Sequence, residues 1–354
     1  MLIYWLVWGW ITLLAFFEKN NIIFKYLYAF TFVFIILFVG FRYEIGVDWY
    51  TYLIIYDYLD GLSFKDTILY TDPMYGAFNY LSNKIGIEGM WLVNLSCSII
   101  LFYFLYKFSE KFKYVAIPFF VSYTYFIIVV SMNYVRQSVA ISISLLALYF
   151  AMNNKKYKFL LLIFFASLFH KSAIFLIVIF PIFYILKFRL NKLMIFIYVF
   201  LSIIFITGAL YYSSINGENI YTSSDSELSS SGALFRLTYH LIPIYLYLYS
   251  RNIFKSEFGK NIFILDFLLI LIFYCVFLAF FYSTLSDRFN LYLYFFDVFV
   301  YAFLCGVYGL KARIYLLITI FLFSTLTLFI WFNYGNFADE GWIPYQNYLI
   351  KFLF

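Results

Sequence analysis

Residues 261–282 read NIFILDFLLILIFYCVFLAFFY, an apolar run in which Asp266 is the only charged residue. An α-helix of roughly 20 apolar residues is long enough to cross the hydrocarbon core of a bilayer. Similar runs recur along the chain, which is 66% hydrophobic and 12% charged over 354 residues. Because soluble domains carry about 25% charged residues, the sequence predicts an integral membrane protein.

Apolar segments of this kind alternate with short polar stretches along the whole chain. The segments are 2–17, 22–39, 90–106, 114–131, 135–152, 159–170, 173–186, 193–212, 235–250, 261–282, 289–310 and 314–332. Those at 159–170 and 173–186 are short for a span, and we expect them to be tilted or buried inside the bundle. The first lacks the basic start and the cleavage site of a signal peptide, so we expect a span there. Since backbone in hydrocarbon must satisfy its own hydrogen bonds, we predict an all-α polytopic membrane helix bundle. It would have about twelve transmembrane helices in one membrane domain, residues 1–354.

The basic residues predict the orientation of the chain. With the amino terminus outside, the inside connections hold most of the 24 Lys and Arg residues but few acids, Glu18, Glu110 and Glu257. These connections are 18–25, 107–113, 153–158, 187–192, 251–260 and 311–313. Because short loops rich in Lys and Arg stay in the cytoplasm, we predict an even number of spans with both termini outside. The net charge of +6 is then explained by contact with lipids of the inner leaflet, and we expect no nucleic acid partner.

The sequence contains no recognisable metal or nucleotide motif. Cys97, Cys275 and Cys305 all fall within apolar segments, and we interpret them as small buried residues. No GxSxG, GxxxxGK[ST] or HExxH pattern occurs. Asp225 and Glu227 form a DxE pair, which we interpret as solvated because it lies in a Ser-rich stretch. We therefore expect neither a metal site nor a cofactor.

Three predicted outer segments are long enough to matter for function. The first, 40–89, is a large loop in which residues 74–85 predict a helix lying at the membrane interface. The second, 213–234, contains YTSSDSELSSSG, and a long polar connection of this kind is either disordered or a mobile lid. The tail, 333–354, ends in GWIPYQNYLIKFLF, an aromatic amphipathic pattern that is typical of an interfacial position.

Arginine is concentrated on the predicted outer side, whereas the inner side is anchored mainly by lysine. The outer arginines are Arg42, Arg136, Arg236 and Arg288. They lie at or just within the ends of spans, where an ionised group costs about 2.5–3.5 kcal/mol toward the bilayer centre. A guanidinium can form two parallel hydrogen bonds to a phosphate. Pairing with outer acids such as Asp48 or Asp287 would explain any one of them, but together they predict an anion site.

Arg136 lies in the segment SMNYVRQSVAISIS, residues 131–144. Asn133 is a candidate N-cap for a helix that would present Arg136 and Gln137 in its first turns. Farther along the chain, Arg236 and His240 stand four residues apart and would share one helix face.

The segment STLSDRFNLYLYFF, residues 283–296, predicts another helix start. Ser286 or Asp287 is a candidate N-cap for a helix that places Arg288 one turn from Tyr292.

The chain has only two histidines, His170 and His240, and both lie on the predicted outer side. A lone histidine in a membrane protein is usually a hydrogen-bonded packing residue. Two of them on the side that gathers arginine suggest that one is a general base.

Five segments of the chain resemble the EpsG family of Wzy-type polymerases. They are GFRYEIGVDWYTY (40–52), NYVRQSVAISI (133–143), FHKSA (169–173), SDRFNLYLYF (286–295) and PYQNY (344–348). The first is the most specific, and the resemblance spans nearly the whole chain. It implies polymerisation of undecaprenyl-pyrophosphate-linked repeat units into O-antigen, capsular or exopolysaccharide at the outer face of a bacterial plasma membrane. By analogy with other polytopic transferases, the fold would be GT-C-like.

The resemblance also implies roles for residues on the matching segments. The residues carried over are Arg42, Asp48, Arg136, Gln137, His170 and Arg288. Arg136 and Arg288 would hold the pyrophosphate. Arg42 would orient Asp48 or bind a second phosphate. His170, or else His240, would accept the proton of the acceptor hydroxyl. Gln137, Arg236, His240 and Tyr292 complete the expected substrate-binding set, of which Arg236 and His240 come from their spacing alone.

The predicted reaction is a metal-independent glycosyl transfer. Pyrophosphate is a good leaving group, so the enzyme needs cationic charge against the departing anion and one base. The expected partners are the donor and acceptor lipids, membrane lipids, a chain-length regulator and a flippase. A lipid-linked oligosaccharide flippase and a glycan ligase remain alternatives. A transporter would place polar residues near the middle of its spans, where Asp266 is nearly alone.

Overall fold

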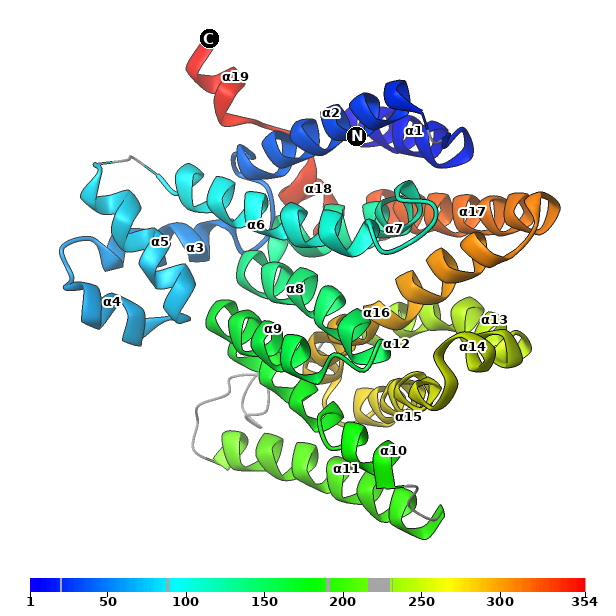
Figure 1. Cartoon of the computed structure of the whole chain (residues 1–354). Coiled ribbons are helices and arrows are strands. Elements are labelled where there is room, and N and C mark those ends of the chain that lie inside the picture. The colour runs from blue at the N-terminus through cyan, green and yellow to red at the C-terminus, as the bar shows by residue number, and fades with distance from the viewer. Residues whose placement is uncertain (20, 87–88, 189–191, 216–229, 231, 354) are drawn as a thin grey trace. The chain divides into compact units, whose positions relative to one another are not determined.

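The computed structural model describes residues 1–19, 21–86, 89–188, 192–215, 230 and 232–353, and no strand occurs among them (Figure 1). Six helical stretches in this part of the chain are long and apolar enough to cross a membrane. They are α2 (Ile22–Gly40), α6 (Trp91–Ser109), α8 (Val135–Met152), Arg251–Ala279, α16 (Ser283–Val307) and α17 (Leu310–Tyr334). The chain is a polytopic membrane helix bundle, as predicted, while the number of twelve spans stays a prediction.

The remaining apolar segments are helical as well. They form α1 (Leu2–Phe16), α7 (Ala116–Ser122), η1 (Tyr123–Ser131), α9 (Lys156–Phe169), η2 (Lys171–Ile179), α10 (Ile182–Phe188), α11 (Lys192–Ile215), α12 (Ala233–Leu237), η3 (Thr238–His240) and α13 (Leu241–Tyr249). The short segment 173–186 contains the 3₁₀ helix η2, which ends before Pro181. A 3₁₀ helix rises about 2 Å per residue and is therefore longer than an α-helix of equal residue number.

The chain forms two compact units. Unit 1 comprises Met1–Leu146, Phe165–Lys171 and Tyr301–Phe354, and unit 2 comprises Ala147–Phe164 and Ser172–Val300. Residues 216–229 and 231 of the predicted loop 213–234, which include Asp225 and Glu227, lie outside the described residues.

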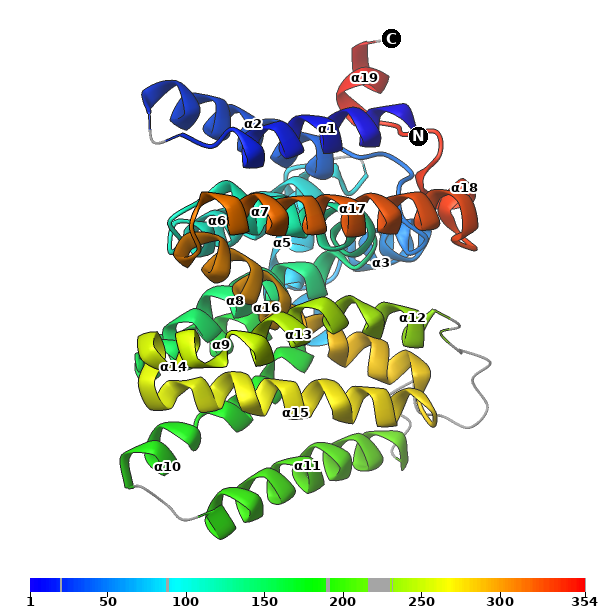
Figure 2. The same cartoon turned by 90° about the vertical axis from the view of Figure 1, so that its right-hand side faces the viewer.

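In unit 1, the membrane helices pack through aromatic rings. Phe32 of α2 and Phe102 of α6 meet edge to face, with ring centroids 6.2 Å apart. Gly40 lets the end of α2 approach α6, because a Cβ at this position would lie 2.9 Å from the Cα of Leu95. On the other side of the unit, Trp8 of α1 stacks on Phe120 of α7 at 4.9 Å. These contacts assemble α1, α2, α6 and α7 around one buried aromatic core (Figure 2).

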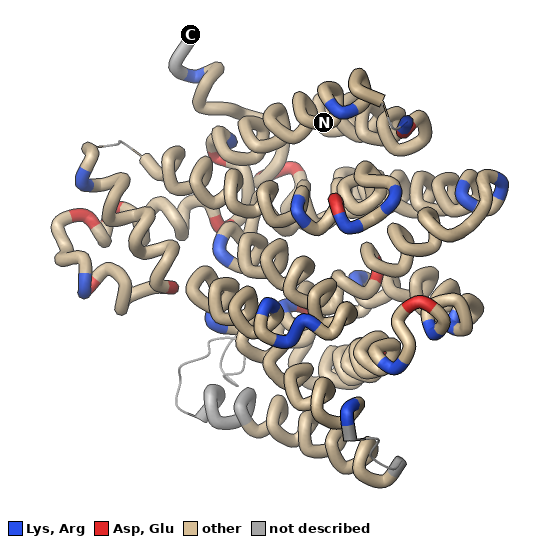
Figure 3. The backbone as a smooth tube through the Cα atoms, viewed as in Figure 1, with Lys and Arg blue, Asp and Glu red and all other residues tan. Residues whose placement is uncertain are grey.

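The first large loop of unit 1 is itself helical. It contains α3 (Trp49–Leu59), α4 (Phe64–Tyr70) and α5 (Pro73–Lys84), and α5 is the helix predicted for residues 74–85. Figure 3 shows acidic and basic residues mixed over these three helices, whereas the turn between α8 and α9 and the start of α9 carry Lys155, Lys156 and Lys158 and no acidic residue.

The end of the chain joins unit 1 through backbone pairing. After α18 (Ala338–Trp342), the segment before α19 (Tyr348–Leu353) runs beside the residues that follow α2, and Arg42 forms an antiparallel bridge with Asn347. The Tyr348 N–H donates to the carbonyl of Phe41 at 2.7 Å. Backbone hydrogen bonds therefore join GFRY and PYQNY, two segments that lie near opposite ends of the sequence.

In unit 2, α12 and α13 lie alongside α14 (Arg251–Phe258) and α15 (Ile262–Ala279) (Figure 2). Asp266, the acid predicted to lie within a span, pairs with Arg251 at 2.6 Å. It also accepts a hydrogen bond from the hydroxyl of Tyr247 at 2.6 Å. The charge of Asp266 is thus compensated within unit 2.

Candidate functional site

Arg136 is held in unit 1 by residues of the loop between α4 and α5. Its Nη1 donates to Thr71 Oγ1 at 3.0 Å and to Asp72 Oδ2 at 2.9 Å. Pro73 begins α5 and keeps Asp72 in an extended conformation, because a residue before proline disfavours the helical region. The side chain of Arg136 is 29% exposed, so this cation is within reach of a ligand.

Two aromatic rings flank the guanidinium of Arg136. Its central carbon lies 5.7 Å from the ring centroid of Tyr52 and 5.6 Å from that of Tyr75. The Nε–H of Arg136 is buried and has no hydrogen-bond partner among the described residues. Arg136 is thus fixed in position while part of its donor capacity is unused.

Asp72 connects Arg136 to the segment that carries His170. Its second oxygen, Oδ1, accepts a hydrogen bond from the backbone N–H of Lys171 at 3.1 Å. Burial raises the pKa of Asp72, and the charge of Arg136 opposes that rise. The Asp-Pro pair is a sequence signal for the start of the helix that follows it. Nothing in the sequence shows which segments the carboxylate joins. His170 itself is partly exposed and directly precedes Lys171.

Arg42 differs from Arg136 in its surroundings. It is only 2% exposed, and its guanidinium donates to the carbonyls of Met132 and Val39 and to Asn94 Oδ1, at 3.1, 2.9 and 3.4 Å. Burial lowers the pKa of Arg42 to about 10. The three hydrogen-bond acceptors of its guanidinium are neutral oxygens, and none of them belongs to Asp48. Arg42 therefore ties the residues after α2 to those before α8.

Asp48 is positioned by the same stretch of chain. Its backbone N–H donates to Asn133 Oδ1 at 3.0 Å, so the side chain predicted to cap α8 holds the start of α3 instead. Gly46 makes this approach feasible: its φ is +103°, and a Cβ there would lie 2.4 Å from the carbonyl oxygen of Met132. Gln137, in the first turn of α8, is buried. Unit 1 thus collects Arg42, Asp48, Arg136, Gln137 and His170.

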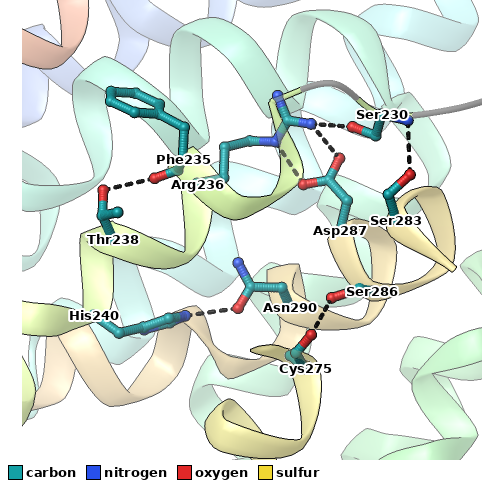
Figure 4. A network of polar contacts seen from close by, with 10 residues as sticks. All are labelled: Ser230, Phe235, Arg236, Thr238, His240, Cys275, Ser283, Ser286, Asp287 and Asn290. Carbon is teal, nitrogen blue, oxygen red and sulfur yellow. Dashed lines mark hydrogen bonds and ion pairs between the residues drawn. The ribbon is translucent and has the colours of Figure 1, made fainter. Parts of the chain in front are cut away.

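In unit 2, Arg236 forms a two-point ion pair with Asp287 (Figure 4). Arg236 Nε lies 2.5 Å from Oδ1 and Nη2 lies 2.9 Å from Oδ2. Nη2 also donates to Ser230, whose own backbone N–H donates to Ser283 Oγ at 3.0 Å. Pairing with this acid was the alternative explanation for Arg236, and both oxygens of Asp287 face its guanidinium.

His240 is buried in unit 2 with both ring nitrogens engaged. Nδ1 lies 2.7 Å from Asp297 Oδ1, and Nε2 lies 2.7 Å from Asn290 Oδ1. The histidine is 2% exposed and Asp297 is 3% exposed, so a hydroxyl substrate has no route to a ring nitrogen in this arrangement. Like Asp266, Asp297 is an acid within a membrane helix. The sequence prediction overlooked it.

The start of α16 differs from the prediction. The helix begins at Ser283, so Ser286 and Asp287 lie inside it and cannot be its N-caps. The hydroxyl of Ser286 donates to the carbonyl of Cys275 at 2.6 Å instead. Arg288 is partly exposed in the same helix, one turn before Tyr292, whose hydroxyl lies 2.9 Å from that of Ser172. Unit 2 thus holds Arg236, His240, Arg288 and Tyr292.

The described residues include no group of three or more His, Cys, Asp or Glu side chains that could hold a metal ion. The donors of the unit 1 site are instead guanidinium, hydroxyl and backbone N–H groups, which bind anions and sugar hydroxyls.

Comparison with known proteins gives a family for the chain. The model of the EpsG family matches residues 25–347, which include four of the five segments discussed above and residues 344–347 of the fifth. No curated protein and no solved structure matches the chain. The family match covers far more than half of the sequence, and the chain therefore belongs to the EpsG family.

Proposed function

We propose that this protein is a metal-independent polysaccharide polymerase at the outer face of a bacterial plasma membrane. Membership of the EpsG family supports a role like that of a polysaccharide polymerase in general terms. The proposed donor and acceptor are oligosaccharide repeat units linked to undecaprenyl pyrophosphate. The products would be O-antigen, capsular or exopolysaccharide.

The observation that carries this proposal is the setting of Arg136. A partly exposed guanidinium, held by Thr71 and Asp72, lies beside two tyrosine rings. A guanidinium in such a setting suits a phosphate group, because its donors are fixed in direction and it remains charged. Tyr52 and Tyr75 add apolar ring faces beside which a sugar or a polyprenyl chain can pack.

The proposed reaction needs only groups that unit 1 contains. The bond between the anomeric carbon of the donor glycan and its pyrophosphate breaks, and the acceptor hydroxyl oxygen forms the new glycosidic bond. Arg136 stabilises the negative charge that develops on the leaving pyrophosphate. His170 accepts the proton of the acceptor hydroxyl. Asp48 and Gln137 complete the proposed substrate site, and Arg42 holds its backbone frame through Met132.

The residues of unit 2 have a separate place in the proposal. Arg288 is partly exposed and stays a predicted substrate-binding residue of unit 2, whereas Tyr292 is buried, and the reaction proposed for unit 1 depends on neither. Arg236 and His240 we assign to the internal structure of unit 2, because Asp287 and Asp297 occupy their charged groups.

The test is the surface polysaccharide of a strain that lacks the gene. Complementation with the natural protein should restore long chains on a gel, whereas Arg136→Ala should give single repeat units only, with normal amounts of protein in the membrane. Lys65→Ala is the matched control, because Lys65 is an exposed cation of the same loop region. Long chains in the Arg136→Ala strain would refute the role of Arg136.

A lipid-linked oligosaccharide flippase is a second candidate function. The buried pair of His240 and Asp297 favours it, because ionisable residues within membrane helices often mark transport pathways. The same deletion strain separates the two functions. Loss of a polymerase leaves single repeat units on the cell surface, whereas loss of a flippase leaves none.

A further inference from the structure

Asp72 occupies the N-cap position of α5 but does not cap the helix. An aspartate at this position normally accepts a hydrogen bond from the second or third backbone N–H of the helix, which contributes about 1 kcal/mol. Here the side chain makes no such bond. Its two oxygens face Arg136 Nη1 and the N–H of Lys171 instead.

The carboxylate of Asp72 links three segments of unit 1. Asp72 is 5% exposed, and burying a carboxylate is costly unless it is paired and hydrogen-bonded. The two contacts satisfy both conditions. They join the loop between α4 and α5 to the first turn of α8 and to the start of η2, which directly follows His170.

The remaining contacts of Arg136 fix the orientation of its guanidinium. Tyr52 and Tyr75 restrict the plane of the guanidinium, and Thr71 shares Nη1 with Asp72. With Nη1 occupied and the plane restricted, the other donors of Arg136 have a fixed orientation. The bond to Lys171 fixes the backbone next to His170 from the same carboxylate.

We propose that Asp72 is a positioning residue that sets the cation at Arg136 and the base at His170 in register with each other. The inference rests on the proposed function, in which Arg136 meets the leaving pyrophosphate and His170 the acceptor hydroxyl. A positioning residue acts on the transition state more than on substrate binding, and a misplacement of about 1 Å can cost about 100-fold in rate.

The experiment uses the full-length protein in lipid vesicles with purified lipid-linked repeat units. Asp72→Asn keeps an oxygen for the Lys171 N–H but loses the charge that pairs with Arg136. We expect its kcat to fall by about 10- to 100-fold with a KM within about twofold of the natural protein. Asp60→Asn is the matched control, because Asp60 is an exposed acid of the same loop region that does not contact Arg136, and we expect its kcat to stay within about threefold.

Conservative rescue separates positioning from folding. Asp72→Glu keeps the charge on a longer side chain, and its kcat should lie between those of Asp72→Asn and the natural protein. The midpoint of thermal unfolding, measured for each variant, reports the folded fraction independently of activity. A kcat of Asp72→Asn equal to the natural value, or a raised KM at unchanged kcat, would overturn the inference. So would a fall in rate that only mirrors the folded fraction.

The outcomes also distinguish this inference from the proposed function. If the natural protein polymerises repeat units and Arg136→Ala does not, while Asp72→Asn is fully active, the positioning role alone is wrong. If the natural protein forms no polymer under these conditions, the proposed function fails and the positioning role fails with it.

Discussion

Two of the arginines predicted to lie on the outer side, Arg136 in unit 1 and Arg236 in unit 2, pair with an aspartate, and the two pairs are built differently. In unit 2, two nitrogens of Arg236 face two oxygens of Asp287, so each group satisfies the other. In unit 1, Arg136 gives one nitrogen to one oxygen of Asp72, whose other oxygen is bonded to Lys171. A mutually satisfied pair suits a structural role, whereas a partly used guanidinium suits ligand binding.

The sharpest way to break this comparison is to replace both members of each pair by amides. The double variant Arg136→Gln with Asp72→Asn should form no detectable polymer, a loss of about 1,000-fold or more, because the cation that stabilises the leaving group is gone. The double variant Arg236→Gln with Asp287→Asn should retain activity within about fivefold, since a buried ion pair can be replaced without leaving one charge alone. Polymer formation is measured per molecule of membrane-inserted protein. Equal losses in both variants would remove the distinction between the pairs.

The two units also differ in their histidines, of which we propose His170 and not His240 as the general base. His170→Ala should lower kcat by about 100-fold and leave the amount of protein unchanged, because general base catalysis contributes on that scale. His240→Ala should instead lower the amount of folded protein, because it leaves Asp297 buried without its partner. The measurements are polymerisation rate per molecule and the unfolding midpoint of each purified variant. A folded His240→Ala protein with a 100-fold lower rate would make His240 the better candidate for the base.

Sequence reasoning reached the membrane fold, but not the partners of the residues proposed for the site. The helices follow from apolar segments whose lengths match a bilayer, and this local signal is strong. Which acid each arginine meets depends on long-range contacts that periodicity does not encode. Arg236 illustrates this: its spacing suggested a ligand site, but its partner lies on α16.

The same limit explains the residues that the sequence prediction overlooked. Asp72 looked like one of many acids in a long loop, and its role depends on contacts with α8 and η2. Asp297 lies in an apolar helix, where a count of loop charges does not register it. The pairing of Arg42 with Asn347 joins residues about 300 positions apart, and no local pattern indicates it.

Arg42 gives a milder test within unit 1. Arg42→Gln should reduce the amount of folded protein several-fold, because it removes hydrogen bonds that join the ends of α2 and η1, and a loss of about 1–2 kcal/mol changes abundance to that extent. Activity per folded molecule should stay within about threefold, in contrast to variants of Arg136. Membrane abundance and polymerisation rate are measured on the same preparation. Normal abundance together with lost activity would show that Arg42 meets the substrate.

The smallest expected effect concerns Glu18, an acid held by backbone groups instead of arginine. Its oxygens accept hydrogen bonds from the N–H groups of Val115 and Ala116, at 2.7 and 3.1 Å. Burial raises the pKa of Glu18 from 4.5 to about 7. The folded state therefore favours the protonated acid, so its contribution to stability is present below pH 4.5 and is lost as the pH rises through about 7.

Glu18→Gln should remove this dependence on pH, because the amide does not titrate and still offers one acceptor oxygen. The midpoint of thermal unfolding, measured in detergent between pH 4.5 and 7, should fall with rising pH more steeply for the natural protein than for the variant. Parallel curves would show that Glu18 does not titrate in this range.

The proposed polymerase requires Arg136 to face the outer side of the membrane, and cysteine labelling of intact cells measures this sidedness directly. Cys97, Cys275 and Cys305 are buried and would first be replaced by serine. A membrane-impermeant maleimide should then label Val47→Cys, which lies beside Asp48 and is 43% exposed, but not Lys311→Cys, on a predicted inside connection. Labelling at position 311 and not at position 47 would place the Arg136 site on the cytoplasmic side and contradict the proposed polymerase.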